Sequence, residues 1–496
     1  MFLYASLLLN QLCDRHHYDD ESVRRKLDQL PKNPTDVYDR VVADVHDDWN
    51  NSPRLSQIAQ NTLKWLLQAQ RFIDCGSMLE AVSLVGAKAK ADEVIWSCRT
   101  LVVKENGAFN PAHYSVREYL RRKPEYSPTH CHLVATEGCL RMLNTLFELR
   151  ESGREPSQSE EKFGAYALLY WPVHHEGIKL ANGDNRWDSI NALLRKFLRQ
   201  GHGKTDKYED WLGQARQLAP KSTDEGGLSS KLDSLQATPP SPLFAACVFG
   251  FADIIGKFGR DLRGLNRCNM QGKSALSLAI ENKKLAAVRA LLSRRFPADV
   301  NLLNIKAVEQ YEYFQPDPKP SIIHYASPLQ AAAACGDRDI AEYLLEKGAH
   351  LELVAGYHGN ALQAAALDGH EDVVALLLSN GAEPNSQCGY HGNALQAAAT
   401  RGHVGVINLL LENKRPALVS TPGVSYGSAL MAAIHANCSE AVWILLDEGV
   451  DANAKKGKEG VQRHRISLAG RTCKSESVTS RKNPSSTASR CYARDD

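Results

Sequence analysis

The stretch GYHGNALQAAALDGH at residues 356–370 recurs as GYHGNALQAAATRGH at residues 389–403, 33 residues further along the chain. Further copies align on the leucine of this motif, at Leu243, Leu276, Leu329, Leu362, Leu395 and Leu430. The spacings between these leucines are 33, 53, 33, 33 and 35 residues. A period near 33 residues indicates a solenoid, in which each unit packs against its neighbours. We therefore expect about six repeats between residues 238 and 455.

Each copy carries the signals that start a helix. The residue two positions before the leucine is a good N-cap in every copy: Ser241, Ser274, Ser327, Asn360, Asn393 and Ser428. Proline or alanine follows the cap, and both suit the first helical position. A second helix follows, and its apolar face is formed by Val373, Val374, Leu377 and Leu378. Gly381 is placed to end that helix in the left-handed conformation.

This pattern resembles the T-P-L-H-x-A motif of ankyrin repeats. The resemblance implies a mainly α fold that binds a protein partner through a groove and projecting hairpins. The spacing of 53 residues indicates an insertion near 303–322, where YEYFQPDPKP has the composition of an irregular loop. We expect distortion in the first repeat, which lacks a closing turn, and at Lys414–Pro416, which replaces the usual glycine turn.

Several residues of the repeats are candidates for binding. Glutamine replaces the motif histidine at Gln330, Gln363 and Gln396, and we expect it to supply the hydrogen bonds that link adjacent turns. The candidate partner-binding residues are Tyr357, His358, Tyr390, His391, Tyr426, Asp368 and Arg401. Two interpretations of the aromatic row at the hairpin tips stay open. It is either an exposed contact surface or a set of rings packed on the next hairpin.

A second resemblance covers residues 1–125. LPKNPTDVYDRV at 30–41, LKWLL at 63–67 and HYSVREYL at 113–120 are similar to three elements that follow the nucleotide-binding module in fungal NACHT (STAND-type) proteins. The resemblance implies a winged-helix region, and it implies that the NTPase core of such a protein is absent from this chain. Where the family has a proline-leucine pair, this chain has Phe72-Ile73, which leaves the exact boundary open.

Local signals agree with a winged-helix hairpin. Leu101–Val103 is a strand candidate, the asparagine-glycine pair at 106–107 favours a two-residue turn, and Phe109–Tyr114 can form the returning strand. We expect Ser115 to cap the next helix in a capping box with Glu118. Upstream, an apolar residue recurs every four positions and predicts an amphipathic helix: Val37, Val41, Val45 and Trp49.

The rest of the chain divides by composition. Residues 126–225 have the pattern of further helices, and YALLYWPVHH at 166–175 resembles the segment that precedes repeats in the same NACHT proteins. Residues 226–237 are expected to be a flexible linker, and residues 456–496 a disordered basic tail. The apolar residues 1–12 are too few to span a bilayer, which takes about 20 residues. We expect a core-facing helix there, with secretion as the alternative.

Composition and charge exclude several function classes. Hydrophobic residues make up 43% of the 496-residue chain, which is neither a disordered nor a membrane composition. The net charge of +2 provides no whole-chain attraction to nucleic acid or anionic lipid, although residues 455–496 hold 11 basic and 4 acidic side chains. The 12 cysteines are scattered without a C-x-x-C pair, which favours reduced thiols in the cytoplasm. The His16-His17 and His174-His175 pairs lack further ligands at metal-binding spacing, so we expect no metal site.

Two stretches end like a phosphate-binding loop, whose pattern is G-x-x-x-x-G-K-[ST]. At 203–205 and 272–274 the required first glycine is replaced by Leu198 and Arg267. We therefore expect no nucleotide, cofactor or catalytic site, and no nucleic-acid or membrane partner. The sequence favours a non-catalytic protein–protein interaction module. Two alternatives stay open: an NTPase-linked signalling subunit with an unrecognised nucleotide site, and DNA binding through the winged helix.

Overall fold

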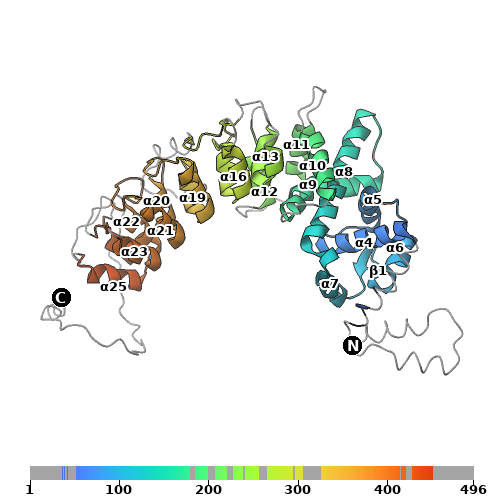
Figure 1. The fold of residues 1–496 in the computed structure, drawn as a ribbon, viewed down its shortest axis with the longest axis horizontal. Coiled ribbons are helices and arrows are strands. Elements are labelled where there is room, and N and C mark those ends of the chain that lie inside the picture. The colour runs from blue at the N-terminus through green and yellow to red at the C-terminus, as the bar shows by residue number, and fades with distance from the viewer. Residues whose placement is uncertain are drawn as a thin grey trace, which may run out of the picture.

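The fold is described from a computed structural model of the chain. The structure describes residues 36, 38, 39, 42, 52–178, 185–198, 207–219, 227–237, 241–255, 265–293, 297–304, 306, 325–413, 415–419 and 427–450. This part of the chain is mainly helical, with one two-stranded sheet. Figure 1 shows a group of helices near the N-terminus that continues into a row of helix pairs. The predicted fold class, mainly α with a C-terminal solenoid, is confirmed.

Residues 53–121 form helices around a small hairpin. The elements are α4 (Pro53–Gln68), α5 (Cys75–Val85), α6 (Ala91–Cys98), η1 (Arg99–Leu101), β1 (Val102–Glu105), β2 (Ala108–Pro111) and α7 (Tyr114–Arg121). Trp65 on α4 is completely buried. Its ring lies edge-on to Phe163 and Tyr166 of α9 (Gln158–Glu176), with centroids 5.6 and 5.9 Å apart. The tryptophan of the LKWLL motif is therefore a core residue that joins α4 to α9.

The predicted hairpin is confirmed, although its second strand ends at Pro111. β1 and β2 are antiparallel, and Glu105 lies opposite Ala108. Asn106 and Gly107 have φ values of 51° and 73°, the left-handed conformation that a type I′ turn requires at both positions. The Gly107 carbonyl accepts a hydrogen bond of 2.8 Å from the Cys75 backbone N–H, which attaches the turn to the start of α5.

The helix after the hairpin begins two residues earlier than predicted. His113 is its N-cap, and His113 Nδ1 accepts a hydrogen bond of 3.2 Å from the Ser115 backbone N–H. Ser115 lies in the first turn, where its Oγ is 2.7 Å from the Tyr38 hydroxyl. The prediction of a capping box between Ser115 and Glu118 is therefore wrong. An imidazole nitrogen accepts a backbone N–H as a serine oxygen does, and the extended backbone of His113 places it there.

The helices predicted within residues 126–225 are present where the structure describes this region. They are α8 (Pro128–Glu151), α9, α10 (Asn185–Leu198) and α11 (Lys207–Leu218), with the 3-10 turn η2 (Pro124–Tyr126) before them. Trp171 of α9 is fully buried, and its ring lies 5.5 Å from Trp211 and 5.3 Å from Phe251. Because Phe251 belongs to the first repeat, the helical region and the solenoid share one continuous core.

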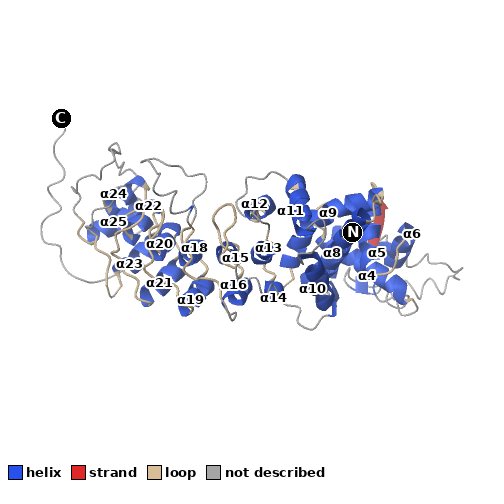
Figure 2. Ribbon diagram, turned by 90° about the horizontal axis from the view of Figure 1, so that it is seen from above, coloured by secondary structure: helices blue, strands red, loops and turns tan. Residues whose placement is uncertain are grey.

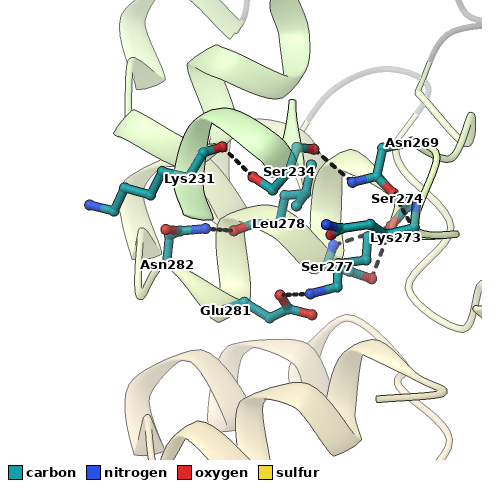
Figure 3. Close-up of polar contacts among 10 residues, drawn as sticks. Lys231, Ser234, Asn269, Lys273, Ser274, Ser277, Leu278, Glu281 and Asn282 are labelled. Carbon is teal, nitrogen blue, oxygen red and sulfur yellow. Dashed lines mark hydrogen bonds and ion pairs between the residues drawn. The ribbon is translucent and has the colours of Figure 1, made fainter. Parts of the chain in front are cut away.

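The prediction of a flexible linker at 226–237 is wrong. This segment contains helix α12 (Leu228–Ser234), and both Leu232 and Leu235 are buried. The Ser234 carbonyl accepts a hydrogen bond of 2.7 Å from Asn269 Nδ2 in the next hairpin (Figure 3). Leu228, Leu232 and Leu235 are spaced four and three residues apart, so they form an apolar stripe along a segment that is otherwise polar. Burial of this stripe stabilises the helix.

An ion-pair cluster also joins the helical region to the repeats. Glu176 at the end of α9 accepts hydrogen bonds from Lys231 on α12 and from Lys284 between α15 and α16. Burial of Glu176 opposes its ionisation, but the two ammonium groups outweigh this effect and lower its pKa. The helical region is therefore attached to the first two repeats by a shared core and by charge.

Within the described residues, 241–450 contain six helix pairs. They are α13 (Pro242–Phe249) with α14 (Ala252–Ile255), α15 (Ala275–Glu281) with α16 (Leu285–Leu292), α18 (Pro328–Cys335) with α19 (Arg338–Glu346), α20 (Ala361–Asp368) with α21 (Glu371–Ser379), α22 (Ala394–Arg401) with α23 (Val404–Leu411), and α24 (Ala429–His435) with α25 (Ser439–Asp447). First helices pack on first helices and second helices on second helices, which gives the two rows seen in Figure 2.

Five of the six predicted N-caps form the expected bond. A side-chain oxygen accepts the backbone N–H three residues later at Ser274, Ser327, Asn360, Asn393 and Ser428. Ser241 makes no such side-chain bond. The first helices are rich in alanine and almost completely buried, as in Ala364–Ala366 and Ala397–Ala399. Small side chains allow neighbouring helices to approach closely, and this packing is the core of the solenoid.

The turn that closes each pair explains one irregular spacing. In a regular unit, the backbone N–H of Ala382 bonds to the Leu377 carbonyl five residues earlier, and Gly381 has the predicted left-handed φ of 92°. In the next unit, the Ala417 N–H bonds to the Leu410 carbonyl seven residues earlier. The distortion predicted near Lys414–Pro416 is therefore a turn lengthened by two residues. The two added residues account for the spacing of 35 residues between Leu395 and Leu430, in place of 33.

Other predictions fall on residues outside the described ranges and stay predictions. They concern the helix at 1–12, the stripe at Val37, Val41, Val45 and Trp49, the 203–205 stretch, the closing turn of the first repeat, most of the insertion near 303–322, and the tail at 456–496.

Candidate protein-binding surface

A ladder of glutamines holds the hairpins in register. Gln330 Nε2 donates hydrogen bonds to the Ala355 carbonyl at 2.9 Å and to the Gly359 carbonyl. In the next unit, Gln363 Nε2 donates to the carbonyls of Ser386 at 3.0 Å and Gly392 at 2.8 Å. The predicted link between adjacent turns is confirmed at these two glutamines. Each hairpin is thus fixed by the helix that precedes it.

The two hairpin tyrosines stack on each other. The rings of Tyr357 and Tyr390 lie 4.9 Å apart at an interplanar angle of 16°. The Tyr390 backbone N–H also donates a hydrogen bond of 2.9 Å to the Tyr357 carbonyl. Both side chains are half-buried. The rings therefore pack on the neighbouring hairpin, and each keeps part of its surface in solvent.

The two hairpin histidines are buried, which agrees with the second interpretation of the aromatic row, rings packed on the neighbouring hairpin. His358 is 5% exposed and His391 is 7% exposed. The His391 ring packs edge-on to Tyr357, with centroids 5.5 Å apart. Burial lowers the pKa of His358 to about 4 and that of His391 to about 3, so both imidazoles are neutral at pH 7. A glycine follows each histidine in the sequence. The hairpin directs each imidazole ring into the interior of the protein.

Asp368 and Arg401 form an ion pair between successive first helices. The Arg401 guanidinium contacts the Asp368 carboxylate, and half of the Arg401 side-chain surface remains exposed. The charge of Arg401 adds to the effect of burial in lowering the pKa of both histidines, and at His358 the carboxylate of Asp368 opposes it. Six of the seven candidate residues therefore gather on two adjacent repeats. In that cluster the histidines fill the interior and the tyrosines and Arg401 reach the surface.

Tyr426 lies outside the described residues, and its register differs from that of the other tyrosines. It precedes Leu430 by four residues, as His358 precedes Leu362. Tyr357 precedes the same leucine by five residues. The sequence position of Tyr426 is therefore that of the buried histidines.

Comparison with protein-family models agrees with this geometry. Models of ankyrin repeats match residues 324–355 (ankyrin repeat), 362–411 (ankyrin repeats, many copies) and 387–456 (ankyrin repeats, three copies). Residues 324–456 are ankyrin repeats. A crystal structure of the human ASB11 ankyrin repeat domain is similar at 25% identity and a TM-score of 0.35, over 44% of this chain and 89% of that chain. No curated protein matches the chain.

Three exposed apolar residues of the ankyrin hairpins were not predicted. Met270, Val354 and Leu418 are 57%, 50% and 61% exposed, and they lie in the hairpins that precede α15, α20 and α24. They occupy different positions of the repeat, so comparison of the copies does not reveal them. The available signal was an apolar residue in a turn where polar residues are usual.

The second of the two lysine loops is part of the framework of the solenoid. Lys273 Nζ donates a hydrogen bond of 2.6 Å to Glu281, and the Lys273 backbone N–H donates to Asn269 Oδ1 (Figure 3). Ser274 caps α15. Burial raises the pKa of Glu281, and the nearby Lys273 ammonium partly offsets this effect. The lysine and hydroxyl that would contact a phosphate are therefore engaged in structural bonds.

The paired histidines of α9 are also structural. His174 Nε2 lies 2.8 Å from the Tyr166 hydroxyl, and His175 packs edge-on to Phe251 at 4.3 Å. Among the described residues, no group of three His, Cys, Asp or Glu side chains is arranged to hold a metal ion. No helix in the described ranges is long and apolar enough to cross a bilayer.

Proposed function

We propose that this chain is a non-catalytic interaction module that binds a protein partner on its ankyrin groove and hairpin tips. The observation that carries the proposal is the Tyr357–Tyr390 stack beside the half-exposed Arg401. Tyrosine and arginine dominate the binding energy of many protein interfaces. Here stacking and the glutamine ladder already hold these groups in place, so little side-chain entropy is lost on binding.

We further propose that the N-terminal region is the winged-helix region of a NACHT-type signalling protein in the cytoplasm. The hairpin from Val102 to Pro111, the following α7 and the buried Trp65 on α4 support this assignment. The continuous core between α9 and the first repeat would then couple partner binding to that region. The engaged state of Lys273 disfavours an NTPase site at 272–274.

Affinity capture with the full chain tests the interaction function. The variant Tyr357→Ala/Tyr390→Ala is compared with wild type and with Glu342→Ala/Glu346→Ala, which changes exposed residues of the second helix α19. Quantitative mass spectrometry should find proteins enriched by the wild type and the α19 variant and depleted at least about tenfold by the tyrosine variant. Equal capture by all three chains would contradict the proposed surface.

The two alternative functions make different predictions for the same protein. Saturable binding of labelled ATP at micromolar concentration would support an unrecognised nucleotide site. Binding to duplex DNA that weakens steeply with salt would support recognition through the winged helix. We expect neither, and circular dichroism of each variant confirms that a loss of capture does not result from unfolding.

A further inference from the structure

The last described helix carries a tryptophan at a position that is otherwise polar or small. Trp443 of α25 is 50% exposed. When the second helices are aligned on their buried leucines, the equivalent residues in the four preceding helices are Arg289, Glu342, Ala375 and Asn408. A tryptophan that replaces such residues exposes a large apolar surface, which is typical of an anchor for another chain segment.

A long side chain at this position can reach the following repeat, although Glu342 and Ala375 stay exposed there. The Arg289 guanidinium lies over the ring of Tyr343 in the next repeat, 5.1 Å from its centroid. Trp443 occupies the position equivalent to Arg289, and its large side chain is long enough to reach toward the place that a following unit would occupy. α25 lies at the far end of the row of helix pairs (Figure 1).

The surface around Trp443 is acidic. Glu440 and Asp447 lie three residues before and four residues after Trp443, which places them on the same helix face. Glu448 follows at the end of the helix, and all three acidic side chains are exposed. None of them forms an ion pair with another described residue. α25 itself, with the sequence SEAVWILLD, contains no basic residue.

We propose that residues 455–474 of the same chain fold back onto α25 and cover Trp443. This segment holds seven basic residues and one acidic residue, with Val461, Ile466 and Leu468 among them. The aliphatic side chains pack on the tryptophan, and the basic side chains pair with Glu440, Asp447 and Glu448. A short tether gives the segment a local concentration on the order of millimolar, so weak contacts are enough. The segment thereby caps a solenoid whose end would otherwise expose apolar surface.

Hydrogen exchange of the full chain, followed by mass spectrometry, tests this proposal. The charge-reversed variant Glu440→Lys/Asp447→Lys is compared with Asp339→Lys/Glu346→Lys, which makes similar changes at the equivalent exposed positions of α19. In wild type and in the α19 variant, amides of residues 461–474 should exchange at least about tenfold more slowly than in an unstructured chain. In the α25 variant this protection should disappear while α18 to α23 stay protected.

Three results would overturn the proposal. The first is exchange of 461–474 at the unstructured rate in wild type. The second is protection that survives charge reversal of α25 and the further change Trp443→Asn, which installs the residue of the preceding repeat. The third is protection that rises with protein concentration, because this would identify a second copy of the chain as the occupant.

Discussion

Replacing Gln363 by alanine tests whether the glutamine ladder holds the repeats together. Gln363 is 3% exposed and donates to the Ser386 and Gly392 carbonyls of the next hairpin. Gly392 keeps a second donor, the Cys388 backbone N–H, whereas the substitution removes the side-chain donor to Ser386. Two lost hydrogen bonds at about 1 kcal/mol each, and one poorly satisfied carbonyl, give a local destabilisation of about 2–4 kcal/mol.

Hydrogen exchange followed by mass spectrometry measures this loss locally, which suits a solenoid whose units interact with nearest neighbours. A loss of 2 kcal/mol corresponds to roughly thirty-fold faster exchange of amides in residues 361–401, because each 1.4 kcal/mol is a factor of ten. The control Gln387→Ala removes an exposed glutamine of the same hairpin and should change little. The variant Gln363→His retains a ring N–H donor, so it should lose less stability than Gln363→Ala and show a smaller increase in exchange rate. Unchanged exchange in Gln363→Ala would refute the reasoning.

Two further predictions concern the hairpins. Gly359 and Gly381 both have positive φ, but an added Cβ at Gly359 would lie 2.9 Å from the Gly389 backbone nitrogen, whereas Gly381 faces open space. In urea unfolding, Gly381→Ala should cost about 1 kcal/mol and Gly359→Ala about 2–4 kcal/mol, and equal costs would contradict the packing. His358 and His391 have folded pKa values of about 4 and 3, below the unfolded value of about 6.5. The unfolded state therefore binds more protons, and the stability of the fold falls as pH drops from 6.5 toward 4. The double variant with tyrosine at both positions should show a smaller fall in melting temperature between pH 7 and pH 4.5, and an unchanged fall would count against buried neutral histidines.

The repeat boundaries could be predicted because local chemistry determines them. An N-cap side chain, a first-turn proline or alanine and a closing glycine act within a few residues, so their pattern is readable in the sequence. The hairpin at 102–111 was predictable for the same reason, since Asn106-Gly107 favours one turn geometry.

The candidate surface was only partly predictable, because burial depends on residues from different repeats. Tyr357 and His358 are adjacent and similar in character, yet one ring reaches solvent and the other is enclosed. The helix at 228–234 was missed because its stability comes from packing on α11 and from the bond to Asn269, and not from its composition. The role of His113 as a cap was missed because the expected serine was two residues away.

The bonds between repeats also determine how this protein can change in length. A deletion of residues 357–389 would join Gly356 to Tyr390 and leave the motif GYHGNALQAAAT intact. Gln330 would then meet the Gly392 carbonyl in place of that of Gly359. The Tyr325 ring, which now lies 5.2 Å from the ring of His358, would meet His391 instead. A duplication of the same 33 residues would add one more identical step. Recombination between the two near-identical motifs can thus shorten or extend the binding surface by a whole unit while the hairpin contacts of Gln330 and Tyr325 are kept.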